Sequence, residues 1–282
     1  MSEISKKAML VDLSISQLTR TKTDRTLTAE STAAHGADNR SIRVIKQLFD
    51  ATAISECNSI IRQCQNIHSA LTLPWNRDGM GILATKNFNE YSTKMRPLLE
   101  ELQVAAQKLA NKRAEALSKA HAKLGTAFNE DDYPTTEEIA TSYKVKISFY
   151  PVPTVGDFRC ELTADDMAVV RAEIEANMNS SMAGATKALV GTLLDGLTHV
   201  TDRIYAGDIT KAGVESMLKK VEAAIKVNVN DDSKLEKLIN ETRQLFASAD
   251  ATTLRENASV SEDLLDKVDE IAAELEEYAG IL

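Results

Sequence analysis

Aromatic residues and glycines are scarce in this chain of 282 residues, and prolines and cysteines are scarcer still. Phe, Trp and Tyr make up 5% of the sequence, which contains 11 glycines, 5 prolines and 3 cysteines. A β-sandwich or β-barrel depends on many turns and on cross-strand aromatic pairs, so this composition argues against an all-β fold. Three scattered cysteines also suit a reducing compartment better than a disulfide-stabilised secreted protein.

Long apolar runs are lacking as well. No stretch approaches the roughly 18–20 consecutive apolar residues that are needed to span a bilayer. At the N-terminus, Asp12 and Ser14 interrupt the apolar segment, so it lacks the apolar core of a signal peptide. We therefore expect a soluble, cytoplasmic protein that does not interact with membranes.

Charge is abundant and unevenly distributed. Charged residues make up 27% of the sequence, and the net charge is −9. Residues 1–125 carry a net charge of +6, whereas residues 126–282 carry −15. A basic half followed by an acidic half indicates a charged partner or head-to-tail contacts between copies. Two solvated faces of different composition are the alternative interpretation.

Hydrophobic periodicity predicts a mainly α-helical protein with a small antiparallel β-sheet. A period of two predicts strands over 9–17, 143–149 and 157–162, and the prolines between the last two belong in their connection. The polar stretch 26–40 reads as a loop or a weak helix. Steps of three and four residues predict helices over 41–71, 87–124, a long span opening at Thr163, 209–226, 233–248 and the last twenty or so residues.

These elements group into four parts along the chain. They are a strand and polar loop (1–40), a basic helical hairpin (41–125), a β-joint (126–162) and an acidic helical region (163–282). The hairpin should be antiparallel, with a loop around Trp75, and Gly125 should cap its second helix. In the joint, Thr135 or Thr136 ahead of Glu138 marks a helix start.

Two features of the acidic region bear on its packing. Gly184, Gly191 and Gly196 each weaken the long helix by about 1 kcal/mol relative to Ala, or let a neighbouring helix approach closely. Apolar residues of the last helix recur in steps of four and three, as in a coiled coil. Packing within the molecule and a short oligomer seam both explain this stripe. Its members are Leu264, Val268, Ile271, Leu275, Tyr278 and Leu282.

Motifs for catalysis or cofactor binding are missing from the sequence. There is no phosphate-binding Gly-x-x-x-x-Gly-Lys-[Ser/Thr] loop, no His-Glu-x-x-His, no Gly-x-Ser-x-Gly and no Cys-x-x-Cys. Asp157 and Arg159 could form a catalytic pair, but an Asp after Gly more often caps a turn. We therefore expect a protein that is not an enzyme and that needs no cofactor.

One set of residues has the character of metal ligands. Cys57, Cys64 and His68 fall at i, i+7 and i+11 on the helix predicted over 41–71, which places them on one face. Thiolate and imidazole are good zinc ligands, but a fourth ligand would have to come from elsewhere. Cysteines acting as small apolar residues on a buried stripe are the simpler interpretation, so we expect no metal site.

A row of lysines offers a second binding hypothesis. The row falls within a narrow arc of the helix over 87–124 and could follow a phosphate backbone while nearby aromatic rings stack on bases. The alternative is a solvated helix face on which Glu115 pairs with one of the lysines. The row consists of Lys108, Lys112, Lys119 and Lys123.

Four segments of the chain resemble a family of tailed-phage proteins that carries a domain-of-unknown-function label. They are MLVDLSISQLTRTKTDR, LTLPWNRDGMGILATKNFNEYSTKMRPL, DDYPTTEEIATSY and FYPVPTVGDFR, in this order and spacing. The resemblance implies a bacteriophage origin, a host bacterial cytoplasm and a mainly helical fold. It also implies genes nearby for a MoxR-type AAA+ ATPase and a von Willebrand A domain protein, which can take a partner's carboxylate at its bound metal.

The leading hypothesis is therefore a non-enzymatic phage accessory or adaptor protein that binds other proteins and forms a homo-oligomer. A single-stranded nucleic-acid-binding or recombination accessory protein, which would use the lysine row, is the alternative. The candidate partner-binding residues lie around the Trp75 loop and on the acidic last helix. They are Trp75, Asp78, Phe88, Tyr91, Asp266, Glu270, Glu274 and Glu277.

Overall fold

The protein is mainly α-helical with a small antiparallel sheet, as the sequence predicts. The computed structural model describes residues 4–38, 40–76, 79–154, 164–229 and 232–282. The chain divides into two compact units, each assembled from separate stretches of sequence. Unit 1 comprises residues 1–12, 67–91 and 148–282, and unit 2 comprises residues 13–66 and 92–147.

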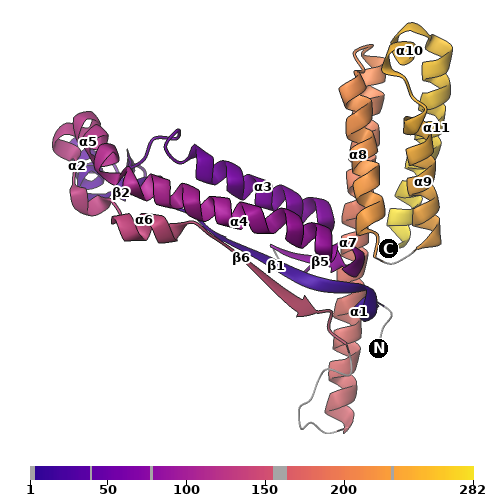
Figure 1. Cartoon of the computed structure of the whole chain (residues 1–282), viewed down its shortest axis with the longest axis horizontal. Coiled ribbons are helices and arrows are strands. Elements are labelled where there is room, and N and C mark those ends of the chain that lie inside the picture. Colours follow the sequence, from indigo (N-terminus) through magenta and orange to yellow (C-terminus); the bar gives the residue numbers. More distant parts are fainter. Residues whose placement is uncertain (1–3, 39, 77–78, 155–163, 230–231) are drawn as a thin grey trace. The chain divides into compact units, whose positions relative to one another are not determined.

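The elements are labelled in Figure 1 where space allows. The strands are β1 (Ala8–Ser16), β2 (Thr21–Asp24), β3 (Val44–Gln47), β4 (Thr72–Pro74), β5 (Met80–Ala84) and β6 (Lys144–Pro151). The α-helices are α1 (Ile4–Lys7), α2 (Arg25–His35), α3 (Ser55–Leu71), α4 (Phe88–Asn111), α5 (Arg113–Leu124), α6 (Thr136–Ser142), α7 (Ala164–Tyr205), α8 (Lys211–Val227), α9 (Ser233–Ala247), α10 (Ala251–Glu256) and α11 (Ala258–Ile281). Short 3₁₀ turns are η1 (Thr85–Asn87), η2 (Gly125–Ala127) and η3 (Glu130–Asp132).

The main sheet has the strand order β4-β5-β1-β6. Strands β1 and β5 are antiparallel, with Leu10 opposite Ile82, and β5 also pairs antiparallel with β4. The predicted strands 9–17 and 143–149 are thus confirmed as sheet neighbours. Pro151 is the last residue of β6 and not part of the connection, which corrects the sequence interpretation. The strand predicted over 157–162 lies outside the described residues.

The stretch around Trp75 is not the open loop that the sequence predicts. It contains β4 and β5, in which Leu73, Ile82 and Leu83 are buried. A Cβ atom at Gly81 would lie 2.5 Å from Thr72 Oγ1, so only glycine permits this close pairing. Strands of three and five residues are too short to show a clear period of two, so the sequence does not reveal them. The turn-forming residues Pro74 and Gly79 are the more obvious signal and favour a loop.

Most of unit 1 is a bundle of four helices, α7, α8, α9 and α11 (Figure 1). Helix α7 packs against α8 and α11, and α9 packs against the same two helices. Leu193, Met217 and Phe246 are buried at its centre. Leu10 and Ile82 belong to the same apolar core, so one face of the sheet is covered by the bundle. Helices predicted over the long span from Thr163, 209–226 and 233–248 are confirmed as α7, α8 and α9.

The heptad-like stripe of α11 faces the interior of the bundle. Five of its six predicted members, Leu264, Val268, Ile271, Leu275 and Tyr278, are buried, and α11 packs on α7 and α9. The sixth, Leu282, follows the end of α11 and is exposed. Because those five side chains are already covered, the stripe packs within the molecule and does not form an oligomer seam. The charged residues of α11 remain on its exposed side.

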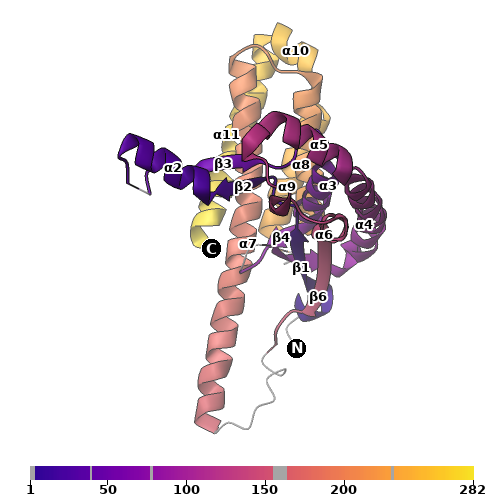
Figure 2. The ribbon, with the colours of Figure 1, turned by 90° about the vertical axis from the view of Figure 1, so that its left-hand side faces the viewer.

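Unit 2 contains most of the predicted helical hairpin, formed by α3 and α4 (Figures 1 and 2). The two helices are antiparallel, and α4 continues through Pro97. The helix predicted from Ser41 begins only at Ser55, because residues 44–47 form β3. Strand β3 pairs antiparallel with β2, an interaction between distant segments that local periodicity does not show. The helix predicted over 87–124 is broken at Lys112 into α4 and α5.

Local capping signals define several helix ends. Thr135 Oγ1 accepts from the Glu138 N–H and Glu138 Oε2 accepts from the Thr135 N–H, at 3.2 and 2.7 Å, so a capping box forms at the predicted start of α6 and Thr135 is its N-cap. Gly125 ends α5 with φ of 52°, as predicted. Most of the polar stretch 26–40 forms α2, so of the two interpretations, a loop or a weak helix, the helix is correct. Asp24, just before α2, accepts from the Leu27 N–H and caps the helix.

Candidate protein-binding surface

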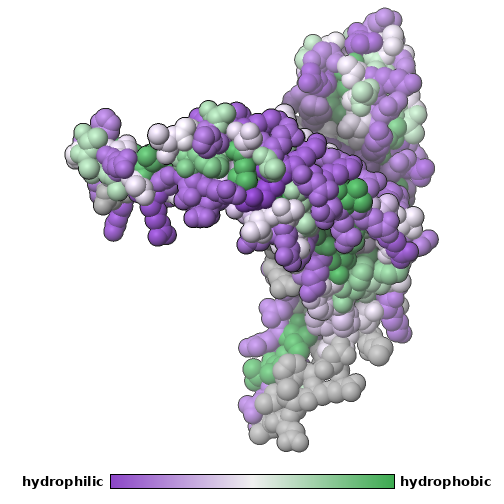
Figure 3. Space-filling view, turned by 60° about the vertical axis from the view of Figure 1, so that its left-hand side comes forward, coloured by the Kyte–Doolittle hydropathy of each residue, from purple (hydrophilic) through white to green (hydrophobic). Residues whose placement is uncertain are grey.

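Hydrophilic residues predominate on the face in Figure 3, and hydrophobic ones form small separate patches. One group of exposed aromatic side chains in unit 1 comes from the start of α4 and the end of β6. Phe88, Phe149 and Tyr150 are 40%, 44% and 43% exposed. The rings of Phe88 and Phe149 meet edge to face, with centroids 5.4 Å apart. We call Phe88 and Phe149 the aromatic patch. Tyr150 follows Phe149 in β6, so its side chain points to the opposite face of the strand.

Buried rings support the aromatic patch from below. Phe149 meets Tyr91 edge to face at 6.3 Å, and Tyr91 is fully buried. The Tyr91 hydroxyl lies 3.0 Å from Nδ1 of His68, which is also buried. Burial lowers the pKa of His68, which favours the neutral imidazole. The patch is therefore fixed to a neutral, hydrogen-bonded pair in the interior.

The structure divides the residues predicted around the Trp75 loop. Phe88 is exposed and belongs to the aromatic patch. Tyr91 is buried, so it supports the surface and is not part of it. Trp75 is half-buried and packs against the core of unit 1. Asp78 lies outside the described residues.

The four predicted acidic residues of α11 lie on its exposed side. Asp266, Glu270, Glu274 and Glu277 are all exposed. Of these, Glu277 forms an ion pair with Lys234 of α9, at 3.2 Å. Both side chains of this pair are more than two-fifths exposed, so its contribution to stability is about 0–1 kcal/mol.

The lysine row is largely paired with carboxylates inside unit 2. Lys108 contacts Glu56 at 3.2 Å, and Lys123 contacts Asp50 at 2.6 Å. Lys119 contacts Glu115 at 2.7 Å, the pairing that sequence spacing suggested. These contacts reduce the positive potential that a phosphate backbone would meet. The pKa of Asp50 is lowered mainly by the hydrogen bond from Lys123.

A hollow of about 670 Å³ lies beside this row, between segment 44–56 and segment 109–124. Its floor contains apolar side chains such as Leu109 and Leu124, and Ile45 at its edge is 57% exposed. Lys112, Lys119 and Lys123 line one side. We call this hollow the lysine groove. Sequence periodicity does not reveal this groove, because it places Ile45 in a helix, whereas Ile45 lies in β3.

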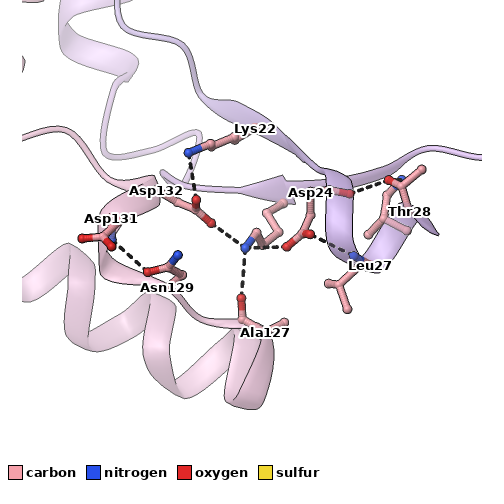
Figure 4. A network of polar contacts seen from close by, with 10 residues as sticks. Lys22, Asp24, Leu27, Thr28, Ala127, Asn129, Asp131 and Asp132 are labelled. Carbon is pink, nitrogen blue, oxygen red and sulfur yellow. Dashed lines mark hydrogen bonds and ion pairs between the residues drawn. The ribbon is translucent and has the colours of Figure 1, made fainter. Parts of the chain in front are cut away.

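A buried lysine, Lys46, lines part of the groove and holds four segments of unit 2 together (Figure 4). Lys46 Nζ lies 2.6 Å from Asp24 Oδ2 and 2.5 Å from Asp132 Oδ2, and it donates to the Ala127 carbonyl at 3.1 Å. Lys22 contacts the other oxygen of Asp132 at 2.8 Å. The three donors of the Lys46 ammonium group thus have three acceptors, an arrangement that suits a structural role.

The candidate metal ligands are buried in apolar surroundings. Cys57 and Cys64 are almost completely inaccessible, and burial raises the pKa of both thiols. His68 is engaged with Tyr91. Among the described residues, no group of three or more His, Cys, Asp or Glu side chains is arranged to hold a metal ion. Asp157 and Arg159 lie outside the described part of the chain.

The fold and surfaces define a helical bundle protein with a second, hairpin-containing unit, an exposed aromatic patch and a lysine-lined groove. In the described part of the chain, no helix combines the length and apolar character needed to cross a membrane. Comparisons with known protein families, curated proteins and solved structures find no match for the chain.

Proposed function

We propose that this chain is a non-enzymatic adaptor that binds another protein through the aromatic patch. The observation that carries the proposal is the exposure of Phe88 and Phe149, whose rings meet each other and rest on the buried Tyr91. Solvent-exposed aromatic rings of this kind are enriched at protein-binding hot spots, because they bury a large area with little loss of side-chain entropy.

The resemblance to a tailed-phage family supports a particular class of partner. It implies a MoxR-type AAA+ ATPase and a von Willebrand A domain protein encoded nearby, and an adaptor would connect such a pair to its target. The acid-rich unit 1 offers carboxylates that a von Willebrand A domain can bind through its metal. In this proposal the protein acts in the host bacterial cytoplasm.

Purified proteins test this proposal. We expect the chain to bind the von Willebrand A protein or the MoxR-type ATPase of its own genome in biolayer interferometry. Replacing Phe88 and Phe149 by Ala should weaken binding at least about tenfold, since both exposed rings of the patch are removed. Tyr205→Ala is the matched control, because Tyr205 is a 72% exposed aromatic residue of unit 1 outside the patch.

Two results would contradict the proposal. One is the absence of binding to both proteins, and the other is equal binding by the wild type, the patch variant and the control. Circular dichroism of each variant shows whether the fold is retained, so a loss of binding by an unfolded variant is recognised.

A further inference from the structure

The lysine groove carries a regular pattern on the side formed by α5. Ala116, Lys119 and Lys123 follow one another in steps of three and four, so they share one face of α5. Lys112, the N-cap residue of α5, lies four positions before Ala116 and lines the same groove. The side chains of Lys119 and Lys123 are 61% and 62% exposed. The small Ala116 lies between the lysines and leaves room for another helix to come close.

The exposed side of α11 carries the same pattern with opposite charge. Asp266, Glu270, Ala273 and Glu277 also follow in steps of four, three and four, and all four residues are exposed. The apolar stripe of α11 is buried in its own bundle, so this face is the part of the helix that remains available to a partner.

We propose that the lysine groove of one copy binds the exposed face of α11 of a second copy, with the two helices antiparallel. In this register every lysine faces a carboxylate and the two alanines face each other. The facing pairs are Lys112 with Glu277, Ala116 with Ala273, Lys119 with Glu270, and Lys123 with Asp266. Because the helical rise is the same on both sides, the spacings of about 6, 4.5 and 6 Å coincide.

The charges of the two units favour this contact. Unit 1 contains 17 Lys and Arg against 29 Asp and Glu, a net charge of −12, whereas unit 2 contains 16 against 13, a net charge of +3. Contacts between unlike units of neighbouring copies are therefore attractive, and contacts between two copies of unit 1 are repulsive. A groove-to-helix contact of this kind is head-to-tail and repeats from copy to copy.

The existing ion pairs of the groove do not prevent its lysines from contacting the carboxylates of a second copy. Lys119–Glu115 and Lys123–Asp50 are more than two-fifths exposed at both ends, so each contributes little to the stability of unit 2. The carboxylates of Glu115 and Asp50 stay on the rim and oppose the incoming acids. Association is therefore weak and strongly dependent on salt. Approach at Ala116 also covers part of the exposed Ile45.

Charge reversal on the two surfaces provides the test. The groove-reversed variant is K112E/K119E/K123E, and the helix-reversed variant is D266K/E270K/E277K. Sedimentation velocity of the wild type should show association at about 25 mM NaCl that weakens at least tenfold at about 500 mM, because screening shortens the reach of surface charges. Each variant alone should sediment as a monomer, and an equimolar mixture of the two should associate.

Restoration in the mixture distinguishes lost contacts from lost structure, since an unfolded variant cannot be rescued by its complement. The control K211E/K219E/K237E makes the same charge change at exposed lysines of unit 1 outside the groove, and it should associate through its groove like the wild type. A monomeric wild type at low salt overturns the proposal. So does a salt-insensitive oligomer, or a mixture of reversed variants that remains monomeric.

Discussion

At the scale of single residues, Lys46 shows how much structure can depend on one buried charge. Its side chain is 7% exposed, and those of Asp24 and Asp132 are 12% exposed. The hydrogen bonds that Lys46 donates to Asp132 and Asp24 raise the pKa of Lys46, so the ammonium form persists despite burial. Through these contacts Lys46 of β3 joins Asp24, the N-cap of α2, to Ala127 of η2 and Asp132 of η3.

Replacing Lys46 by Met should lower the free energy of unfolding by about 2 kcal/mol. This loss arises because two poorly solvated carboxylates would lose their partner, and their remaining exposure keeps the effect below that of a fully buried pair. Urea unfolding followed by circular dichroism measures it. Lys22→Met is the matched control, since Lys22 is 48% exposed and its removal should cost about 0.5 kcal/mol or less.

The effect of Lys46→Met should also depend on pH. The pKa of Asp24 is lowered mainly by the hydrogen bond from Lys46, and that of Asp132 by hydrogen bonds from Lys22 and Lys46. A carboxylate with a lowered pKa stabilises the fold above its unfolded value, about 3.9, and this contribution disappears as the pH falls through the folded value. The difference between wild type and variant should therefore be constant near pH 7 and shrink below about pH 4. A difference that stays constant down to pH 3 would contradict this assignment.

At the scale of elements, two glycines of α7 have different surroundings and therefore different roles. A Cβ atom at Gly196 would lie 2.7 Å from Met217 Sδ, so α8 occupies the space that a side chain would need. At Gly184 no atom lies within 4 Å of the same position. Both explanations for a glycine in this helix therefore apply, at different positions. Gly196 permits the close approach of α8, whereas Gly184 only weakens the helix.

Alanine substitutions should have opposite effects at these two glycines. Gly184→Ala should stabilise the protein by about 0.5–1 kcal/mol, because alanine restricts the unfolded chain and meets no obstacle. Gly196→Ala should destabilise it by about 1 kcal/mol, since overpacking against the buried Met217 exceeds the gain in helix propensity. Thermal unfolding of both variants measures the two changes, and changes of the same sign would refute the distinction.

At the scale of the whole molecule, charge is partitioned by structural unit and not simply by halves of the sequence. The net charges of −12 in unit 1 and +3 in unit 2 follow from stretches that alternate along the chain. Self-repulsion among acidic helices opposes the compact state of unit 1. In unit 2, ion pairs such as Lys123–Asp50 and those of Lys46 contribute favourably.

Salt should therefore affect the two units in opposite directions. Raising NaCl from about 25 to about 500 mM screens repulsion in unit 1 and weakens ion pairing in unit 2. Hydrogen exchange followed by mass spectrometry should show slower exchange in α9 and faster exchange in β2 and β3. The wild type should be used at a protein concentration at which sedimentation velocity shows a monomer, so that self-association does not alter exchange. Equal changes in both units would contradict this account of the charges.

The sequence by itself determined the features that depend on neighbours along the chain. The mainly helical class, the helix start near Thr135 ahead of Glu138, the glycine cap at Gly125 and the apolar stripe of α11 all follow from spacing within a few residues. These interactions form within one element, so its residues are sufficient to predict them.

Tertiary structure alone decided which segments pair and which side chains are covered. Strand β3 exists because it meets β2, and β4 and β5 because β5 pairs with β1. The aromatic residues Phe88 and Tyr91 lie three positions apart, yet one is exposed and the other buried, because Tyr91 faces His68 in the interior. Burial and long-range pairing depend on what a residue meets across the fold, and that information is not contained in local spacing.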